Sequence, residues 1–79
     1  MPAQLLVCVT NYEFNANALA LKRFFVPIFE TIIIDAAAPW GFAEDDITIE
    51  ITYYPGRWNE SVSQAIQRDA EWLLFIASD

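Results

Sequence analysis

Two acidic residues of this sequence stand close to the ends of apolar runs. Asp35 directly follows one such run, and Asp79 comes shortly after another. A hydroxyl, an amide and a phenol follow a third run, at Thr10, Asn11 and Tyr12. Two carboxylates that are not surrounded by lysine or arginine could bind ribose hydroxyls, the amide of a nucleotide base, or a divalent ion that itself binds a diphosphate. Whether these side chains act together depends on the strands and helices that position them.

Four segments of the sequence predict strands. Residues 5–9, 31–34 and 72–77 are continuous runs of apolar or β-branched residues, which is typical of strands covered on both faces in a parallel sheet. Residues 47–54 instead alternate between large apolar and polar side chains, so one face of this strand is apolar and the other is polar. The alternation predicts an edge strand, and the continuous runs predict internal strands.

Two helices are expected between these strands. Asn15 and Asn17 offer caps for the first helix, and Pro27 disfavours helix at Val26, so this helix should end near there. Its apolar face contains Leu21, Phe24, Phe25 and Ile28. Asn59 is the expected cap of the second helix. The inward face of that helix is predicted to contain Trp58, Val62, Ala65, Ile66 and Asp69.

The elements assemble into one α/β domain over residues 1–79. Residues 36–46 have no periodicity and are interpreted as a long connection, whose acidic residues 44–46 form a solvated face. Right-handed crossovers then favour a mainly parallel sheet of order 3-2-1-4 with a helix on each face, which is half of a doubly wound Rossmann-like fold. Ligands of such sheets bind beyond the carboxyl ends of the strands, here near the switch point between strands 1 and 4.

Composition argues against several classes of function. The net charge is −7, and the four basic residues, Lys22, Arg23, Arg57 and Arg68, are spread along the chain, which argues against a nucleic-acid partner. No apolar run reaches the roughly 18 residues of a membrane span, and no basic flank of a signal peptide precedes the first run, so we expect a cytoplasmic protein. The chain has one cysteine and no histidine. A zinc site is therefore not expected, and Cys8 is interpreted as a buried thiol.

The usual phosphate-binding loops are absent from the sequence. There is no G-x-G-x-x-G after the first strand and no G-x-x-x-x-G-K-[ST], and the chain has only two glycines. A dinucleotide site or a P-loop is therefore not expected. The carboxylates point instead to a nucleotide-sugar type of site, in which a divalent ion carries the diphosphate.

Several segments resemble family 2-like glycosyltransferases with the GT-A fold. Val9-Thr10-Asn11-Tyr12 looks like the turn after the family's first strand, and Thr31-Ile32-Ile33-Ile34-Asp35 looks like its second strand, which ends in an aspartate. Residues 59–66 and 70–79 resemble the helix and strand that lead into the family's metal-binding Asp-x-Asp-type motif. The resemblance covers nearly the whole chain and rests on the order and spacing of these motifs.

This resemblance implies the donor side of a glycosyltransferase. It implies that Thr10, Asn11, Tyr12 and Asp35 bind the nucleotide of a nucleoside diphosphate sugar. It also implies that Asp79, at the last aspartate of the motif, holds a divalent metal, manganese or magnesium. The full enzyme would transfer the sugar from this donor to an acceptor hydroxyl.

The sequence also departs from the family pattern. Ala77 stands where the motif usually has an acidic or amide residue, and three alanines at positions 36–38 replace the polar turn after Asp35. The family's acceptor-binding half and its catalytic base lie beyond the position of Asp79. No catalytic residue is therefore assigned, and this portion alone is expected to be inactive.

A second hypothesis stays open, that of a non-catalytic α/β interaction module. Carboxylates at strand ends are common solvated caps and turn formers, and Tyr12 either stacks on a base or packs at the domain edge. Under both hypotheses the strand at residues 72–77 leaves a long apolar edge. This edge predicts a homodimer or a higher homo-oligomer.

Overall fold

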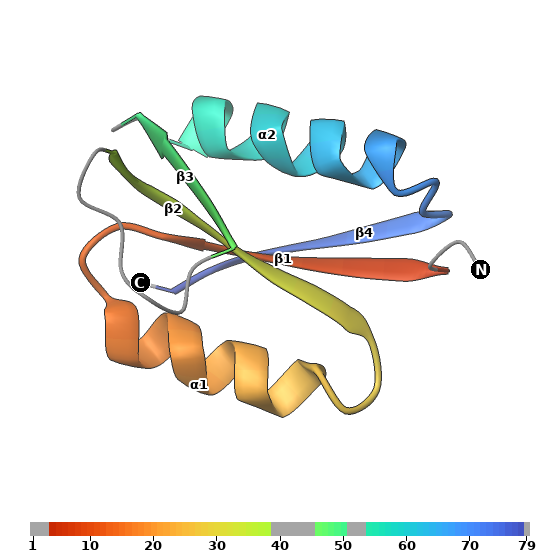
Figure 1. Cartoon of the computed structure of the whole chain (residues 1–79), viewed down its shortest axis with the longest axis horizontal. Coiled ribbons are helices and arrows are strands. Elements are labelled where there is room, and N and C mark those ends of the chain that lie inside the picture. Colours follow the sequence, from red (N-terminus) through yellow and green to blue (C-terminus); the bar gives the residue numbers. More distant parts are fainter. Residues whose placement is uncertain (1–3, 39–45, 51–53, 79) are drawn as a thin grey trace.

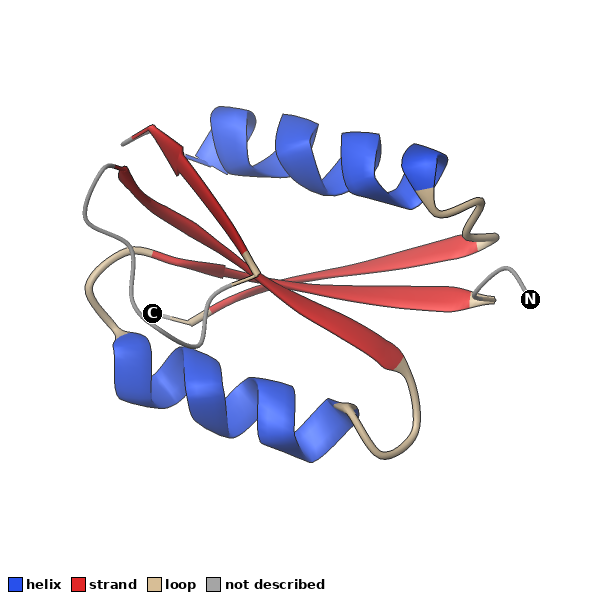
Figure 2. Cartoon of the chain, in the orientation of Figure 1, coloured by secondary structure: helices blue, strands red, loops and turns tan. Residues whose placement is uncertain are grey.

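The structure, a computed structural model, describes residues 4–38, 46–50 and 54–78 and has helices on both faces of one sheet (Figure 1). The elements are β1 (Leu5–Asn11), α1 (Asn15–Phe25), β2 (Glu30–Ala38), β3 (Ile47–Glu50), α2 (Tyr54–Gln67) and β4 (Trp72–Ala77). The described strand pairs are all parallel, in the order β3-β2-β1-β4. α1 covers one face and α2 the other (Figure 2). The predicted fold class and strand order are confirmed.

β1 is covered on both faces, which explains why its sequence is a continuous apolar run. Successive side chains of a strand point to opposite faces. On the α2 face, the buried residues of one cluster are Leu6, Cys8, Ile32 and Ile34. On the α1 face, the buried residues of a second cluster are Val7, Val9, Ala18 and Ile33. Each helix therefore closes one apolar layer, as parallel sheets require.

β2 is longer than the sequence predicts. The expectation places Asp35 just after this strand, whereas in the structure Asp35 lies within it, paired with Asn11 of β1 and Thr48 of β3. The prediction that the whole segment 36–46 is a connection is wrong for residues 36–38, which belong to β2. The backbone of β2 stays paired with β3 as far as Ala38, the Cα partner of Glu50, with a register irregularity between Asp35 and Ala38.

β3 is an edge strand, as predicted. Its side chains alternate between half-buried isoleucines and exposed polar residues. The predicted strand extends to Tyr54, which in the structure begins α2, and residues 51–53 lie outside the described part of the chain. The predicted cap Asn59 is also wrong, because it lies inside the helix. Pro55 in the first turn is the better start signal, since its fixed φ suits a helix N-terminus.

α1 ends at Phe25, close to the predicted end. The reason given for it is wrong, because Val26, which precedes Pro27, keeps helical φ and ψ of −51° and −40° and its N–H donates to the Lys22 carbonyl oxygen. The start of α1 differs from the prediction, because Phe14 occupies the N-cap position and no side chain caps the helix. Asn15 and Asn17 bond elsewhere, as described below. The predicted apolar face is correct for Leu21 and Phe25, which pack against the core. It is wrong for Phe24 and Ile28, which are exposed.

The inward face of α2 also differs from the prediction. Trp58 and Ile66 are 47% and 74% exposed. The residues turned toward the sheet are Arg57, Ser61 and Ala65, which follow one another at helical spacing. The Ser61 hydroxyl donates to the Arg57 carbonyl oxygen at 2.9 Å. Small side chains at the contact let the helix approach the strands closely, which an indole ring would prevent.

The buried thiol of Cys8 should make the free energy of unfolding depend on pH. Burial raises the pKa of Cys8 from 9.0 to about 11, against a smaller lowering by a hydrogen bond with Ser61. Between pH 9 and 11 the unfolded thiol therefore ionises while the folded thiol keeps its proton, so the free energy of unfolding should fall. The loss should be on the order of 2 kcal/mol.

Urea unfolding of the wild type and of Cys8→Ala across this pH range measures the effect. Tyrosine and lysine ionisation acts on both proteins, so the difference between them isolates the thiol. Parallel stability curves for the two proteins would contradict the assignment.

Candidate functional site

The side chain of Asn11, at the carboxyl end of β1, contacts polar side chains from β2, from the start of α1 and from the residue after β4. Its Nδ2 donates to Asp35 Oδ1 at 3.1 Å and to Asn15 Oδ1 at 2.8 Å. Its Oδ1 accepts a hydrogen bond of 2.6 Å from the Ser78 hydroxyl. Asn11 is fully buried, and Asp35 and Ser78 are 2% and 6% exposed. These four residues are called the Asn11 network below.

The register of the sheet brings these residues to one level. Asn11 of β1 is the Cα partner of Asp35 in β2. On the other side of β1, the backbone N–H of Ser78 donates to the Thr10 carbonyl oxygen at 2.9 Å. The Asn17 amide of α1 donates to the Ser78 carbonyl oxygen at 3.2 Å. The start of α1 is thereby tied to the ends of β1 and β4.

This place is the switch point of the fold. β1 continues through α1 to β2 on one side, while β4 arrives from α2 on the other side. Connections that diverge in this way leave the crevice in which doubly wound sheets bind their ligands. The turn from β1 to α1 passes through Glu13, whose φ of 69° lies in the left-handed region that few glutamates adopt. Glu13 and Asn15 are exposed, and Tyr12 is half-buried.

The Asn11 amide orients its neighbours and is not itself the group that would contact a ligand. Both of its N–H bonds and its oxygen are used within the network. It holds the carboxylate of Asp35 in place at the end of β1. The Thr10 hydroxyl is also turned inward, toward the Ile76 carbonyl oxygen at 3.4 Å. The chemistry of the site is therefore that of a fixed, hydrogen-bonded carboxylate beside an aromatic turn.

The structure brings most of the predicted site residues together. Thr10 and Asn11 end β1, Asp35 lies beside Asn11 within β2, and Tyr12 follows Asn11 directly in the chain. The predicted metal ligand, Asp79, lies outside the described residues. The four nucleotide-binding candidates therefore occupy one end of the sheet.

The hydrogen bonds of two polar side chains, Asn15 and Asp46, were not predicted from the sequence. Asn15 bonds the Asn11 amide instead of capping its own helix. Asp46 was predicted to belong to a solvated loop face, but its carboxylate accepts from the Ile33 backbone N–H at 2.7 Å and from Lys22 Nζ at 2.6 Å. It thus joins β2, the start of β3 and α1. An asparagine at the start of a helix and an acidic residue before a strand look the same in sequence whether or not they make such contacts.

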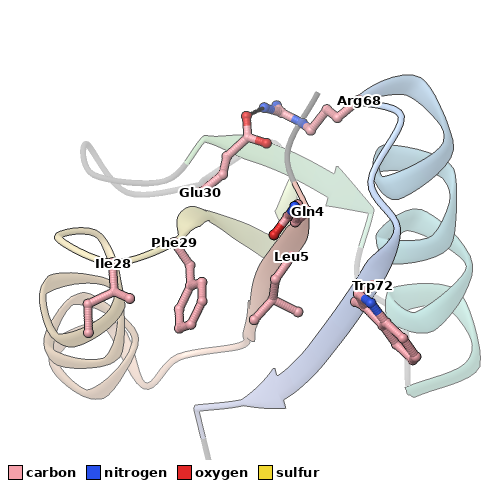
Figure 3. Close-up of a pocket in the computed structure, with 7 residues that line it drawn as sticks. All are labelled: Gln4, Leu5, Ile28, Phe29, Glu30, Arg68 and Trp72. Carbon is pink, nitrogen blue, oxygen red and sulfur yellow. Dashed lines mark hydrogen bonds and ion pairs between the residues drawn. The ribbon is translucent and has the colours of Figure 1, made fainter. Parts of the chain in front are cut away.

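A hollow of about 740 Å³ lies at the opposite end of the sheet, where the strands begin. Its lining includes Gln4, Leu5, Phe29, Glu30, Arg68 and Trp72 (Figure 3). Arg68 donates to the Glu30 carboxylate at 3.1 Å across its rim. The hollow contains none of the predicted site residues. Since parallel sheets bind ligands beyond the carboxyl ends of their strands, the Asn11 network is the candidate site.

The described residues do not form a metal centre by themselves. Across residues 4–38, 46–50 and 54–78, no three acidic, cysteine or histidine side chains cluster closely enough to hold an ion. Over the same ranges, neither helix has the length and apolar character needed to cross a membrane.

Comparison with known proteins adds no family to this description. No family model matches the chain, and no curated protein and no solved structure is significantly similar to it.

Asn11→Asp should destabilise the protein at neutral pH, because it sets a second carboxylate at hydrogen-bond distance from Asp35. The free energy of unfolding at pH 7 should fall by about 2 to 4 kcal/mol. Part of the loss should return toward pH 4, where the pair takes up a proton. Urea unfolding at both pH values measures this. Asn59→Asp, the same change on the exposed side of α2, should cost less than about 0.5 kcal/mol. Equal losses of unfolding free energy for the two variants would contradict a hydrogen bond between Asn11 and Asp35.

Proposed function

We propose that the chain is the nucleotide-sugar-binding portion of a glycosyltransferase of the GT-A type. Its role is to hold the donor, a nucleoside diphosphate sugar, from which the full enzyme transfers the sugar to an acceptor hydroxyl. No residue of the chain is assigned to the chemical step. The chain by itself is therefore expected to bind the donor without turning it over.

The observation that supports this proposal is the fixed carboxylate of Asp35 at the switch point. Burial of a carboxylate is costly unless it is hydrogen-bonded, and the Asn11 amide provides such a bond at 3.1 Å. A carboxylate held in this way is a preorganised acceptor for ribose hydroxyls or for the N–H of a base. Tyr12, next to Asn11, adds a ring that can stack on the base. The resemblance to the family assigns the nucleotide to these same residues.

The proposal includes a divalent ion, manganese or magnesium. No lysine or arginine belongs to the Asn11 network, and the proposed ion supplies positive charge for a diphosphate bound beside it. In the proposal, the carboxylate of Asp79 and the diphosphate oxygens hold the ion together. Ala77 leaves Asp79 as the single acidic ligand of its motif. Ion and nucleotide should therefore bind together rather than separately.

A second candidate function is a non-catalytic α/β interaction module, and the surface around β4 favours it. β4 is an edge strand of the described sheet. Trp72 at its start is 71% exposed, and Trp58 of α2, which contacts Phe75 of β4, is 47% exposed. Large aromatic side chains beside an open strand edge are typical of a surface that another chain covers. A homo-oligomer through residues 72–77 is the proposed assembly.

Calorimetric titration tests the donor-binding proposal. UDP, GDP and ADP are titrated separately into the protein, with and without manganese. One of them should bind in the presence of manganese and release much less heat without it. Asp35→Asn should weaken that binding about tenfold or more, because a hydrogen bond to a charged acceptor contributes about 1.5 to 3 kcal/mol.

Asp69→Asn is the matched control for this titration. It removes the same charge at an exposed turn, where the φ of 55° suits asparagine as well as aspartate. It should bind the nucleotide as the wild type does. Circular dichroism verifies that both variants are folded, and Tyr12→Ala provides a second variant if Asp35→Asn is not. Absence of binding for all three nucleotides to the folded wild type would rule out the donor-binding function.

A further inference from the structure

Within the part of the chain that the structure describes, the outer edge of β4 has main-chain N–H and C=O groups that no other strand bonds. Among the described strands, β4 pairs only with β1. The backbone N–H groups of Trp72 and Ser78 donate toward β1, to Gln4 and Thr10. Because these directions alternate along a strand, the outward N–H and C=O groups belong to Leu73, Phe75 and Ala77. These are the groups that a further strand would bond.

β4 also lacks the features that usually protect an open edge. Natural edge strands carry charges or proline, or are very short. β4 has six residues, Trp72–Ala77, and none of them is charged or a proline. The other edge of the described sheet, β3, presents Thr48 and Glu50 to solvent. The two edges therefore differ, and only β4 is suited to pairing.

We propose that two copies of the chain pair through β4, antiparallel, about a two-fold axis at Phe75. A two-fold axis perpendicular to the sheet makes the two strands antiparallel and the contact isologous. In this register Phe75 lies opposite the second copy's Phe75, and Leu73 lies opposite the second copy's Ala77. All three outward residues of both copies then form hydrogen-bonded pairs. A shift of the axis to either side would leave one of them unpaired.

Side chains on both faces of the sheet fit this register. Leu73 packs in the cluster on the α2 face, so Phe75 points to that face as well. Its ring lies 5.3 Å from that of Trp58 in an edge-to-face contact. In the dimer the two Phe75 rings lie next to each other, with one Trp58 on each flank. On the α1 face, Leu74 comes opposite the second copy's Ile76, so apolar surface is buried there too.

The occupant of the edge is a second copy because the surface complements itself in both hydrogen-bond register and side-chain type. This inference deepens the interaction-module proposal and does not depend on nucleotide binding. Each copy has a net charge of −7, so repulsion opposes pairing and the affinity should rise with ionic strength. A contact of one short strand is small for a protein interface, and we expect a dissociation constant of roughly micromolar size.

Cysteine cross-linking tests the register. In a hydrogen-bonded antiparallel pair the Cα atoms are about 5.5 Å apart, which a disulfide can span. Phe75→Cys should therefore oxidise to a covalent dimer. Leu73→Cys is the matched control, because its two copies would be roughly 13 Å apart. It should not cross-link to itself but should cross-link to Ala77→Cys in a mixture. The native thiol, Cys8, is buried and should not react.

Sedimentation velocity across a concentration series tests the dimer without cysteines. The wild type should dimerise, more tightly at higher salt, and Phe75→Lys should weaken the dimer at least tenfold. Phe24→Lys makes the same change at a residue of α1 that is 70% exposed and should leave the dimer intact. A monomeric wild type at all concentrations and salt levels would overturn the proposal, as would equal self-cross-linking of Leu73→Cys and Phe75→Cys. Dimerisation without nucleotide binding would refute only the donor-binding function.

Discussion

The burial of β1 on both faces is the constraint on which the rest of this structure depends. Helices cover both of its faces, and strands pair with both of its edges. Polar chemistry is therefore possible only where the strand ends. Its last residue, Asn11, is still fully buried, so its polar groups must find partners inside the protein. The Asn11 network satisfies that requirement.

The Asn11 amide suits this position because it donates and accepts at once. It donates to a carboxylate on the β2 side and accepts from a hydroxyl on the β4 side. A carboxylate at the same position would repel Asp35, and an aliphatic side chain would leave Asp35 and Ser78 without this partner. The same contacts stabilise the fold and fix the orientation of Asp35. A structural role and a ligand-binding role are therefore compatible, and they differ in whether Asp35 also contacts a bound molecule.

The sequence predicted strand order better than it predicted which side chains face inward. The continuous runs correctly mark β1 and β2 as internal and the alternating run marks β3 as an edge strand, but the prediction of an internal strand is wrong for β4, which lies at an edge of the described sheet. Short crossovers then leave few possible strand orders. The inward face of α2 could not be found in this way, because Ser61 and Ala65 are chosen for their small size while Trp58 is larger and more apolar. The ties made by Asn15 and Asp46 depend on atoms brought together by the tertiary fold. Local sequence patterns therefore cannot predict these hydrogen bonds.

The two edges of the described sheet have consequences for how far the protein can assemble. β3 alternates polar and apolar side chains and has exposed Thr48 and Glu50, so it is a poor template for another strand. β4 is apolar and accessible along its outer edge. A chain with two open edges could add copies without limit, whereas one open edge permits a single isologous contact that closes on itself. The net charge of −7 further opposes any larger assembly. The proposed pairing through β4 would therefore close on itself as a dimer and would not extend into a fibre.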